Sequence, residues 1–202
     1  MAKKRTRSSA DASQEKILQA AIALFARHGL DQTSFAQIAR ACGLSQANIL
    51  YHFQSKERLI QAMILKIVAN NRATVATYHS PKSTPREQLT HYFRGNLEWG
   101  LKFPDETRVI LLMYYYASFQ PAFRELYDQI LYSARERLET CLEGIQREER
   151  LKLQTSVKAT AQILHDWLLG TLINFTTAGK KSATTTTLMK EKWDVLLSSL
   201  LR

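Results

Sequence analysis

Apolar residues recur along most of this chain with the period of an α-helix. Ile17, Ala21, Leu24 and Phe25 lie at i, i+4, i+7 and i+8, so they share one face of a helix that Gly29 ends. Similar patterns, bounded by capping residues, prolines and glycines, predict further helices over 34–42, 45–53, 56–78, 84–103, 105–119, 121–150, 155–177 and 187–200. No segment shows the strict alternation that is typical of a half-buried strand. We therefore predict an all-α fold of about nine helices, with three short ones first.

The composition supports this fold class and indicates a location. Four prolines and seven glycines in 202 residues favour long helices over a fold with many strands. Cys42 and Cys141 match neither metal-ligand nor disulfide spacings, so we expect no metal, no cofactor and a reducing, cytoplasmic setting. The basic start, residues 1–7, lacks the apolar stretch of a secretory signal, and the longest apolar run, 109–119, is shorter than the roughly 20 residues that span a bilayer. We expect no membrane partner.

Two of the short helices carry the most informative pattern. Ser34 and Gln37 have the spacing of a capping box at the start of the first of them, and Ser45 caps the second. Between the caps, Ala39 is small enough for close helix packing and Gly43 permits a sharp turn. An αα-hairpin inside a helical bundle would share this spacing. Together with the caps, however, it favours a helix-turn-helix, whose second helix enters the major groove of DNA.

The second helix of this motif offers side chains that suit DNA. Gln46 and Asn48 can each pair with adenine through two hydrogen bonds, and Ala47 can touch a thymine methyl group. Hydroxyl, amide and ammonium groups at the starts of neighbouring helices suit phosphates, which fix the register of a protein on the duplex. The residues that we expect to contact DNA are Thr33, Ser34, Ser45, Gln46, Ala47, Asn48, Tyr51, His52 and Lys56.

The charge of the chain agrees with a polyanionic partner. The net charge is +10, and residues 1–60 hold nine Lys and Arg against four Asp and Glu, an excess of five. Four of these basic residues lie between positions 3 and 7, on an arm that could reach a neighbouring minor groove. A solvated tail is the alternative for the arm, and solubility is the alternative for the charge as a whole. A basic field attracts nucleic acid but does not identify it.

The order of these motifs resembles the TetR family of repressors. The matching segments are FARHG at 25–29, TSFAQIA at 33–39, GLS at 43–45, YHF at 51–53 and SKERL at 55–59. They cover about the first 60 residues, and beyond them only the helical layout and the length agree with the family. Gln46, Ala47 and Leu50 stand where the family often has lysine, glycine and an aromatic residue.

The resemblance implies a homodimer that binds a palindromic DNA operator. It also implies a C-terminal pocket for a small-molecule effector that weakens DNA binding, which would make the chain a ligand-responsive repressor. The domains that we predict are a basic flexible arm over 1–12, a helix-turn-helix domain over 13–58 and a six-helix ligand-binding and dimerisation domain over 59–202.

The last two predicted helices are candidates for the dimer interface. The penultimate helix is apolar nearly all round, so it must be buried on more than one side. Gly170 would let a partner helix approach closely, and a two-fold interface would use the same patch from both subunits. The alternative is that both helices complete the core of a monomer. The interface residues that we predict are Trp167, Leu168, Thr171, Leu172, Phe175, Trp193, Leu196 and Leu200.

Aromatic residues in the middle of the chain are candidates for the effector pocket. Ligand sites are mostly apolar with a few polar groups, and tyrosine and histidine supply both characters. The alternative is that these side chains are plain core. The pocket residues that we predict are Trp99, Phe103, Met113, Tyr115, Phe119, Tyr127 and His165, which as a group suit an apolar or aromatic ligand.

Three other classes of protein fit the sequence less well. An enzyme is disfavoured because the five histidines are scattered and no nucleophile, metal-protease or phosphate-loop motif occurs. A membrane-surface protein is disfavoured because no terminal helix combines a basic face with a wide apolar face. A basic architectural protein, which would bind duplexes with a steep salt dependence and little sequence preference, is the main alternative to a regulator.

Overall fold

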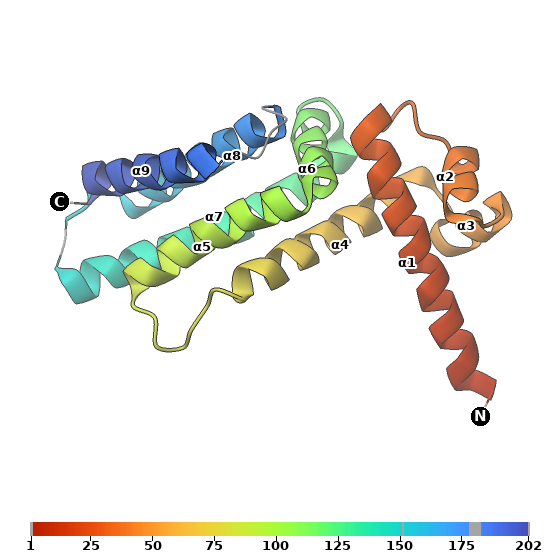
Figure 1. Cartoon of the computed structure of the whole chain (residues 1–202), viewed down its shortest axis with the longest axis horizontal. Helices are drawn as coiled ribbons and strands as arrows, with labels where there is room; N and C mark the ends of the chain where they lie inside the picture. Colours follow the sequence, from red (N-terminus) through yellow and green to blue (C-terminus); the bar gives the residue numbers. More distant parts are fainter. Residues whose placement is uncertain (1, 151, 178–182, 202) are drawn as a thin grey trace. The chain divides into compact units, whose positions relative to one another are not determined.

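A computed structural model describes the backbone of residues 2–150, 152–177 and 183–201, and the side chains of 10–150, 152–174, 176–177 and 191–201. Within this part of the chain the fold is all-α, as the sequence predicts, and no strand longer than an isolated bridge is present. The helices, labelled in Figure 1, are α1 (Ala2–His28), α2 (Phe35–Cys42), α3 (Gln46–Phe53), α4 (Lys56–Ala76), α5 (Pro85–Lys102), α6 (Pro104–Ala117), α7 (Pro121–Glu149), α8 (Val157–Thr177) and α9 (Ala183–Leu200).

Two helix starts differ from the sequence-based expectation. Helix α1 begins at Ala2, so the backbone of the predicted arm continues the helix that we expected to start at residue 13. Alanine, lysine and arginine are good helix formers, and no glycine or proline interrupts them before Gly29. Helix α9 begins at Ala183 rather than at 187. The side chains of residues 1–9, which include the basic residues of the predicted arm, lie outside the described residues.

Capping boxes are present at the starts of two helices, and the one at Ser34 confirms the prediction from the sequence. At α2, the Gln37 amide donates to Ser34 Oγ at 3.3 Å, and the Ser34 amide donates to Gln37 Oε1 at 2.7 Å. At α5, the same reciprocal pair joins Thr84 and Glu87, with Pro85 in the first turn. These bonds satisfy amides that a helix start leaves without an intrahelical partner.

The chain forms two compact units. The first contains Met1–Asn70 and Asp105–Phe119, and the second contains Asn71–Pro104 and Gln120–Arg202. Helix α6 therefore belongs with α1–α3 and most of α4, a different division from the boundary at residue 58 that the sequence predicts. The part of α4 in the first unit buries Leu59, Met63 and Ile67.

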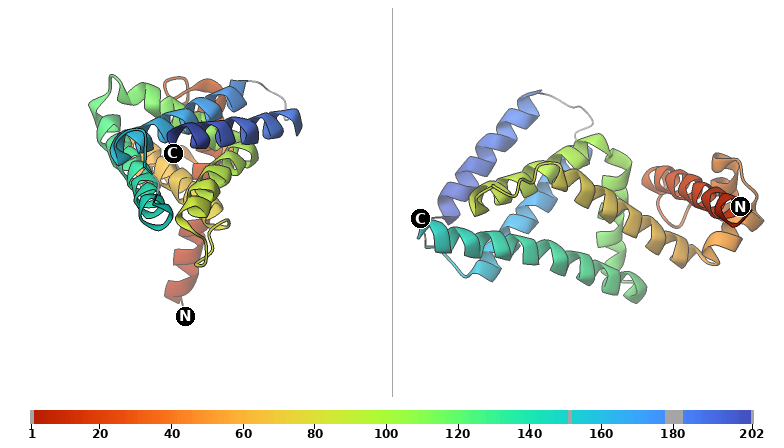
Figure 2. Two further views of the ribbon diagram at one scale, coloured as in Figure 1. Left: turned by 90° about the vertical axis from the view of Figure 1, so that its left-hand side faces the viewer. Right: turned by 90° about the horizontal axis from the view of Figure 1, so that it is seen from below.

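The second unit is a helical bundle with an aromatic centre. Helices α5, α7 and α8 pack on one another, as the two views of Figure 2 show. Phe93 of α5 stacks on Trp193 of α9 with ring centroids 4.2 Å apart, and Trp167 of α8 lies 4.5 Å from Phe93. Among the described residues, no helix has the length and apolar character that a membrane-spanning segment requires.

Candidate nucleic-acid interface

Helices α2 and α3 form a helix-turn-helix held by a small apolar core. Ile38 and Ile49 are fully buried, and Phe25 of α1 is buried with them in the first unit, where α1 contacts both short helices. Gly43 ends α2 with φ +69°, a left-handed conformation that glycine adopts without strain, and its amide bonds back to the Ala39 carbonyl. The turn that the sequence predicts is therefore in place.

The burial of Ile49 and Phe53 turns one face of α3 toward solvent. Ser45 caps this helix by accepting the Asn48 amide at 3.1 Å, so its hydroxyl fixes the helix start. The exposed face consists of Gln46, Ala47, Leu50 and Tyr51. Tyr51 is 79 % exposed, and its ring meets His52 edge to face at 5.4 Å. These positions, spaced i, i+1, i+4 and i+5, share one side of the helix.

Leu50 belongs to this face and is missing from the predicted DNA contacts. It is 43 % exposed, although a leucine normally faces the core. The signal was present in the sequence, because Leu50 lies four residues after Gln46 and one residue after the buried Ile49. An apolar side chain at this place suits the methyl group of thymine.

Two of the residues predicted to contact DNA do not lie on the exposed face of α3. Thr33 is only 2 % exposed, and its hydroxyl donates to the Gly29 carbonyl at 2.9 Å, so this hydroxyl holds the loop between α1 and α2. Asn48 is half-buried, and its Oδ1 is buried without a hydrogen-bond partner among the described residues. For both positions, a contact to DNA would need the backbone amide or a rotated side chain.

Other predicted contact residues lie at helix starts. Ser34 is exposed while its hydroxyl caps α2, and Lys56 is the first residue of α4. Ser55 caps α4 by accepting the Arg58 amide at 3.2 Å. The pKa of Glu57 is lowered by the backbone hydrogen bond that its carboxylate accepts, and by a second bond with Ser55. The start of α4 is therefore well ordered beside Lys56, although Glu57 places a negative charge next to it.

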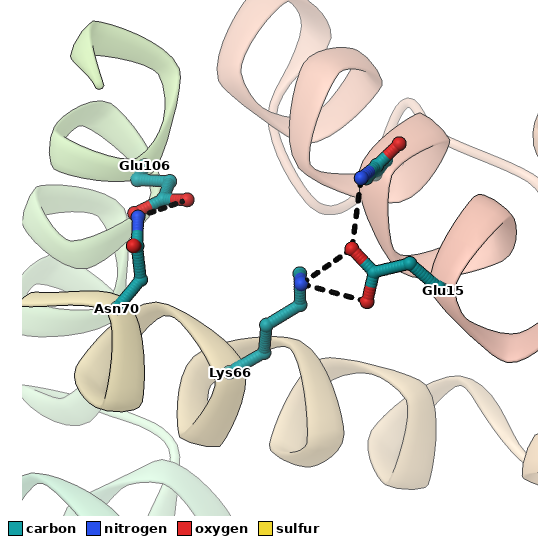
Figure 3. A network of polar contacts seen from close by, with 5 residues as sticks. Glu15, Lys66, Asn70 and Glu106 are labelled. Atoms are coloured by element: carbon teal, nitrogen blue, oxygen red, sulfur yellow. Dashed lines mark hydrogen bonds and ion pairs between the residues drawn. The ribbon is translucent and has the colours of Figure 1, made fainter. Parts of the chain in front are cut away.

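Polar contacts inside the first unit connect α4 to α1 and α6. Figure 3 shows Lys66 of α4 donating to both carboxylate oxygens of Glu15 in α1, at 2.6 and 2.7 Å. One turn further along α4, Asn70 Nδ2 donates to both carboxylate oxygens of Glu106 in α6, at 3.0 and 2.8 Å. Helix α4 thus carries polar links to a helix of the DNA-binding motif and to α6.

A third polar contact ties α6 to the loop that precedes α2. The Tyr116 hydroxyl donates to Asp31 Oδ2 at 2.6 Å. This bond, together with burial, raises the pKa of Tyr116 to about 12. Tyr116 is 7 % exposed, so the bond lies against protein rather than in open solvent. The loop between α1 and α2 therefore has a fixed partner 85 residues away.

The predicted effector residues are divided between the two units. Met113, Tyr115 and Phe119 belong to the first unit, where Met113 is buried and the Tyr115 and Phe119 rings meet at 5.1 Å while both are more than half exposed. The other four, Trp99, Phe103, Tyr127 and His165, belong to the second unit.

His165 is the predicted pocket residue with the clearest environment. It is 6 % exposed, and burial lowers its pKa, with nearby Arg135 contributing. Its Nδ1 lies 3.6 Å from Asp166 Oδ1, beyond hydrogen-bond distance. Nδ1 has no hydrogen-bond partner among the described residues.

The predicted dimer residues lie partly in the core of a single chain. Leu168, Thr171, Leu172 and Trp193 are each at most 8 % exposed, whereas Trp167, Leu196 and Leu200 are half-buried. The Phe175 side chain lies outside the described residues. Among the described residues of α8, the exposed large apolar side chains are Ile163, at 42 %, and Ile173, at 43 %. A Cβ on Gly170, between them on the same side of α8, would meet nothing within 4 Å.

Comparisons with known proteins agree with this geometry. Residues 17–63, which run from the second half of α1 to the first part of α4, match the family described as bacterial regulatory proteins, tetR family. Two relatives in Escherichia coli K12 match a longer stretch. A protein described as "Probable acrEF/envCD operon repressor" is 27 % identical over 121 residues, covering 57 % of this chain and 53 % of that protein. The transcriptional regulator RutR is 31 % identical over 109 residues, covering 54 % and 50 %. The chain thus spans about half the length of these curated relatives.

Solved structures extend the likeness to the whole fold. A TetR transcription regulator from Haloarcula marismortui has a TM-score of 0.80 at 17 % identity, with 95 % of this chain and 100 % of that chain covered. A transcriptional regulator from Saccharomonospora viridis, solved in complex with choline, has a TM-score of 0.79 at 21 % identity, with 95 % and 99 % covered. At such identities the likeness concerns the fold.

The motif, its matching residues and the fold lead to one family. Its members in these comparisons are regulators of transcription rather than enzymes. Residues 17–63 of this chain therefore form a helix-turn-helix that matches the tetR family of bacterial regulatory proteins, and the whole chain has the fold of solved regulators of that family.

Proposed function

We propose that the chain is a ligand-responsive repressor that binds a palindromic DNA operator as a homodimer. The observation that carries the proposal is the exposed face of α3, with Gln46, Ala47, Leu50 and Tyr51 on a helix that is capped at Ser45 and anchored by Ile49. A polar and apolar mixture of this kind reads base edges in the major groove.

We assign the contacts with bases to residues of α3 and the contacts with phosphates to residues at the starts of α2 and α4. Gln46 and Tyr51 provide hydrogen-bonding groups for base edges, while Ala47 and Leu50 provide apolar contact with thymine methyl groups. Ser34, at the start of α2, and Lys56, at the start of α4, lie where helix N-termini favour phosphate. The basic excess in residues 1–60 supports this orientation.

The homodimer is supported by one side of α8. Ile163, Gly170 and Ile173 lie at i, i+7 and i+10, on one face, and the two isoleucines leave more than 40 % of their surface exposed. The open space at Gly170 leaves room for a second helix to approach closely. A second copy of the chain would bury this stripe in a two-fold interface.

The effector response is supported by the polar contacts of α6. Glu106 binds Asn70 of α4, and Tyr116 binds Asp31 in front of α2, so a shift of α6 on ligand binding would disturb the helix-turn-helix. A regulator of similar fold binds choline. For this chain we propose an effector with an apolar or aromatic part.

The test is in vitro selection of the purified protein on a pool of random duplexes at near-physiological salt. We expect enrichment of a palindrome with two half-sites. On that operator, Gln46→Ala and Tyr51→Ala should each lower the affinity by about 10- to 100-fold, because a lost base contact costs about 1–3 kcal/mol. Gln61→Ala, at an exposed position of α4, is the matched control and should bind like the wild type.

A specific outcome would favour the architectural alternative. Binding without an enriched sequence, which fades steeply as salt rises and ignores both α3 substitutions, would refute sequence-specific recognition. Mass spectrometry of the denatured sample would identify any co-purified ligand that keeps the protein off DNA, and the selection would be repeated after its removal.

A further inference from the structure

A cleft of ≈ 520 Å³ lies within the second unit, between the C-terminal end of α4, the first half of α5 and the second half of α7. This volume is in the range of small-molecule sites. The cleft is lined by none of the residues that the sequence predicts for the effector. Each helix contributes one face: Arg72 and Val75 come from α4, His91 and Tyr92 from α5, and Arg137 from α7.

The charges around the cleft are of one sign. Its lining includes two arginines and two histidines, and no aspartate or glutamate. Arg72 Nη2 donates to Ser133 Oγ of α7 at 2.9 Å, a neutral partner that leaves the positive charge of the guanidinium uncompensated. Arg137 has no hydrogen bond or ion pair to another described residue. Two guanidiniums that face the same space without a counter-ion favour an anion between them.

Tyr92 lines the cleft together with both arginines. Burial raises the pKa of Tyr92 to about 12, although Arg137 and Arg72 act in the opposite direction. The hydroxyl is protonated at neutral pH and, beside its hydrogen bond with Asn96, can donate to an anion. Val75, Ala76 and Cys141 add apolar surface to the lining. The site thus combines donors for an oxyanion with apolar wall for the rest of a molecule.

Close helix contacts hold these walls in place. A Cβ on Gly95 of α5 would lie 2.7 Å from Val75 Cα, so only glycine allows α4 and α5 to come this near. Beside this contact, Asn71 Nδ2 donates to Asn96 Oδ1 at 2.9 Å, and Asn96 Nδ2 donates to the Tyr92 carbonyl at 2.8 Å. Asn96 is only 6 % exposed. A buried, satisfied network of this kind makes the site rigid.

We infer that this cleft binds a small organic oxyanion, a carboxylate or a phosphate monoester with an apolar group, between Arg72 and Arg137. Both arginines donate to the oxyanion, Tyr92 adds a third donor, and the apolar group lies against Val75, Ala76 and Cys141. The role of this anion as an effector rests on the proposed function, whereas the binding site itself does not.

The test measures thermal unfolding of the full chain at constant ionic strength with benzoate, octanoate and phenyl phosphate. Benzamide is the neutral match for benzoate, and inorganic phosphate is the match without an apolar group. At ten times its dissociation constant, a bound anion should raise Tm by about 3–6 °C. Arg137→Gln and Arg72→Gln should each remove the shift. Arg147→Gln, at an exposed position of α7, should keep it, and circular dichroism would verify the fold of each variant.

Each result decides the proposal. No shift with any of the three anions at about 10 mM would overturn it, since that concentration exceeds a millimolar dissociation constant. An equal shift with benzamide, or an unchanged shift in Arg137→Gln, would also overturn it. Whether carboxylate or phosphate gives the larger shift identifies the headgroup. If an anion binds but leaves the affinity for the operator unchanged, the binding site is confirmed and its role as an effector site is refuted. This outcome does not depend on the selection experiment, which tests DNA recognition.

Discussion

The hydrogen bond between Tyr116 and Asp31 is a testable link between α6 and the DNA-binding motif. Its length of 2.6 Å and the carboxylate acceptor make it a charge-assisted bond, which contributes about 1.5–3 kcal/mol when well formed. Tyr116 is buried but Asp31 is exposed, so solvent weakens the interaction from one side. We therefore expect a coupling free energy of about 1–2 kcal/mol between the two side chains.

A double-mutant cycle measures this coupling. Urea unfolding of the wild type, Tyr116→Phe, Asp31→Asn and the double variant gives four free energies of unfolding, and their combination isolates the pair. Tyr116→Phe keeps the buried ring, so the free energy of unfolding that this variant loses is the contribution of the hydroxyl group. A coupling below about 0.5 kcal/mol would refute the assignment of a strong bond, because exposed ion pairs already contribute about 0.2–1 kcal/mol.

The same bond predicts a pH dependence of stability. In the folded chain the pKa of Tyr116 is about 12, against an ordinary value of 10.0. The bond therefore stabilises the fold fully below pH 10, and its contribution disappears as the pH rises toward 12. Tyr92 titrates in the same window for a different reason, namely burial. In Tyr116→Phe, the free energy of unfolding should fall less steeply as the pH rises from 10 to 12 than it does in the wild type, and Tyr92→Phe serves as the comparison. The same pH dependence in Tyr116→Phe as in the wild type would contradict the bond.

Three further predictions test the fold and the two interfaces. In urea, the free energy of unfolding of Gly95→Ala should be about 1–3 kcal/mol lower than that of Gly170→Ala. Both variants gain helix propensity, but only Gly95→Ala forces a Cβ against Val75 Cα. Equal free energies of unfolding would mean that α4 and α5 separate at no cost. Trp193→Ala should lower the free energy of unfolding by about 3–5 kcal/mol, even at protein concentrations where light scattering reports a monomer. The reason is that the Trp193 ring stacks on Phe93 in the same chain. Thr33→Val should lower the free energy of unfolding by about 1 kcal/mol through its bond to Gly29, whereas Tyr51→Ala should leave stability within about 0.5 kcal/mol of the wild type and weaken operator binding.

Local signals in the sequence predicted most of the fold. The capping boxes at Ser34 and Thr84 and the glycine at position 43 define helix ends through bonds between near neighbours, so they are readable from spacing alone. The start of α1 was missed because residues 2–12 lack an apolar face, although nothing in them breaks a helix.

The parts that could not be predicted depend on long-range packing. The bond between Asp31 and Tyr116 joins positions 85 residues apart, and neither residue carries a local signal for the other. The cleft is built from single faces of α4, α5 and α7, and its two arginines lie 65 positions apart in the sequence. Thr33 illustrates the same limit on a smaller scale, because its place beside a helix start suggested a phosphate contact, while the Gly29 carbonyl behind it already accepts its hydroxyl.

The residues of α8 differ in how far a single chain buries them. A helix that is apolar on most sides must be buried on more than one of them, but the pattern does not say which side faces the same chain. Here Leu168 and Leu172 are buried in the core of the second unit, and the half-buried Trp167 ring lies 4.5 Å from Phe93. The side that remains holds Ile163 and Ile173 with Gly170 between them. If a second copy of the chain covers α8, Gly170→Leu should therefore yield a monomer by light scattering while Leu168→Ala destabilises the fold; a dimer that persists in Gly170→Leu would place the interface elsewhere.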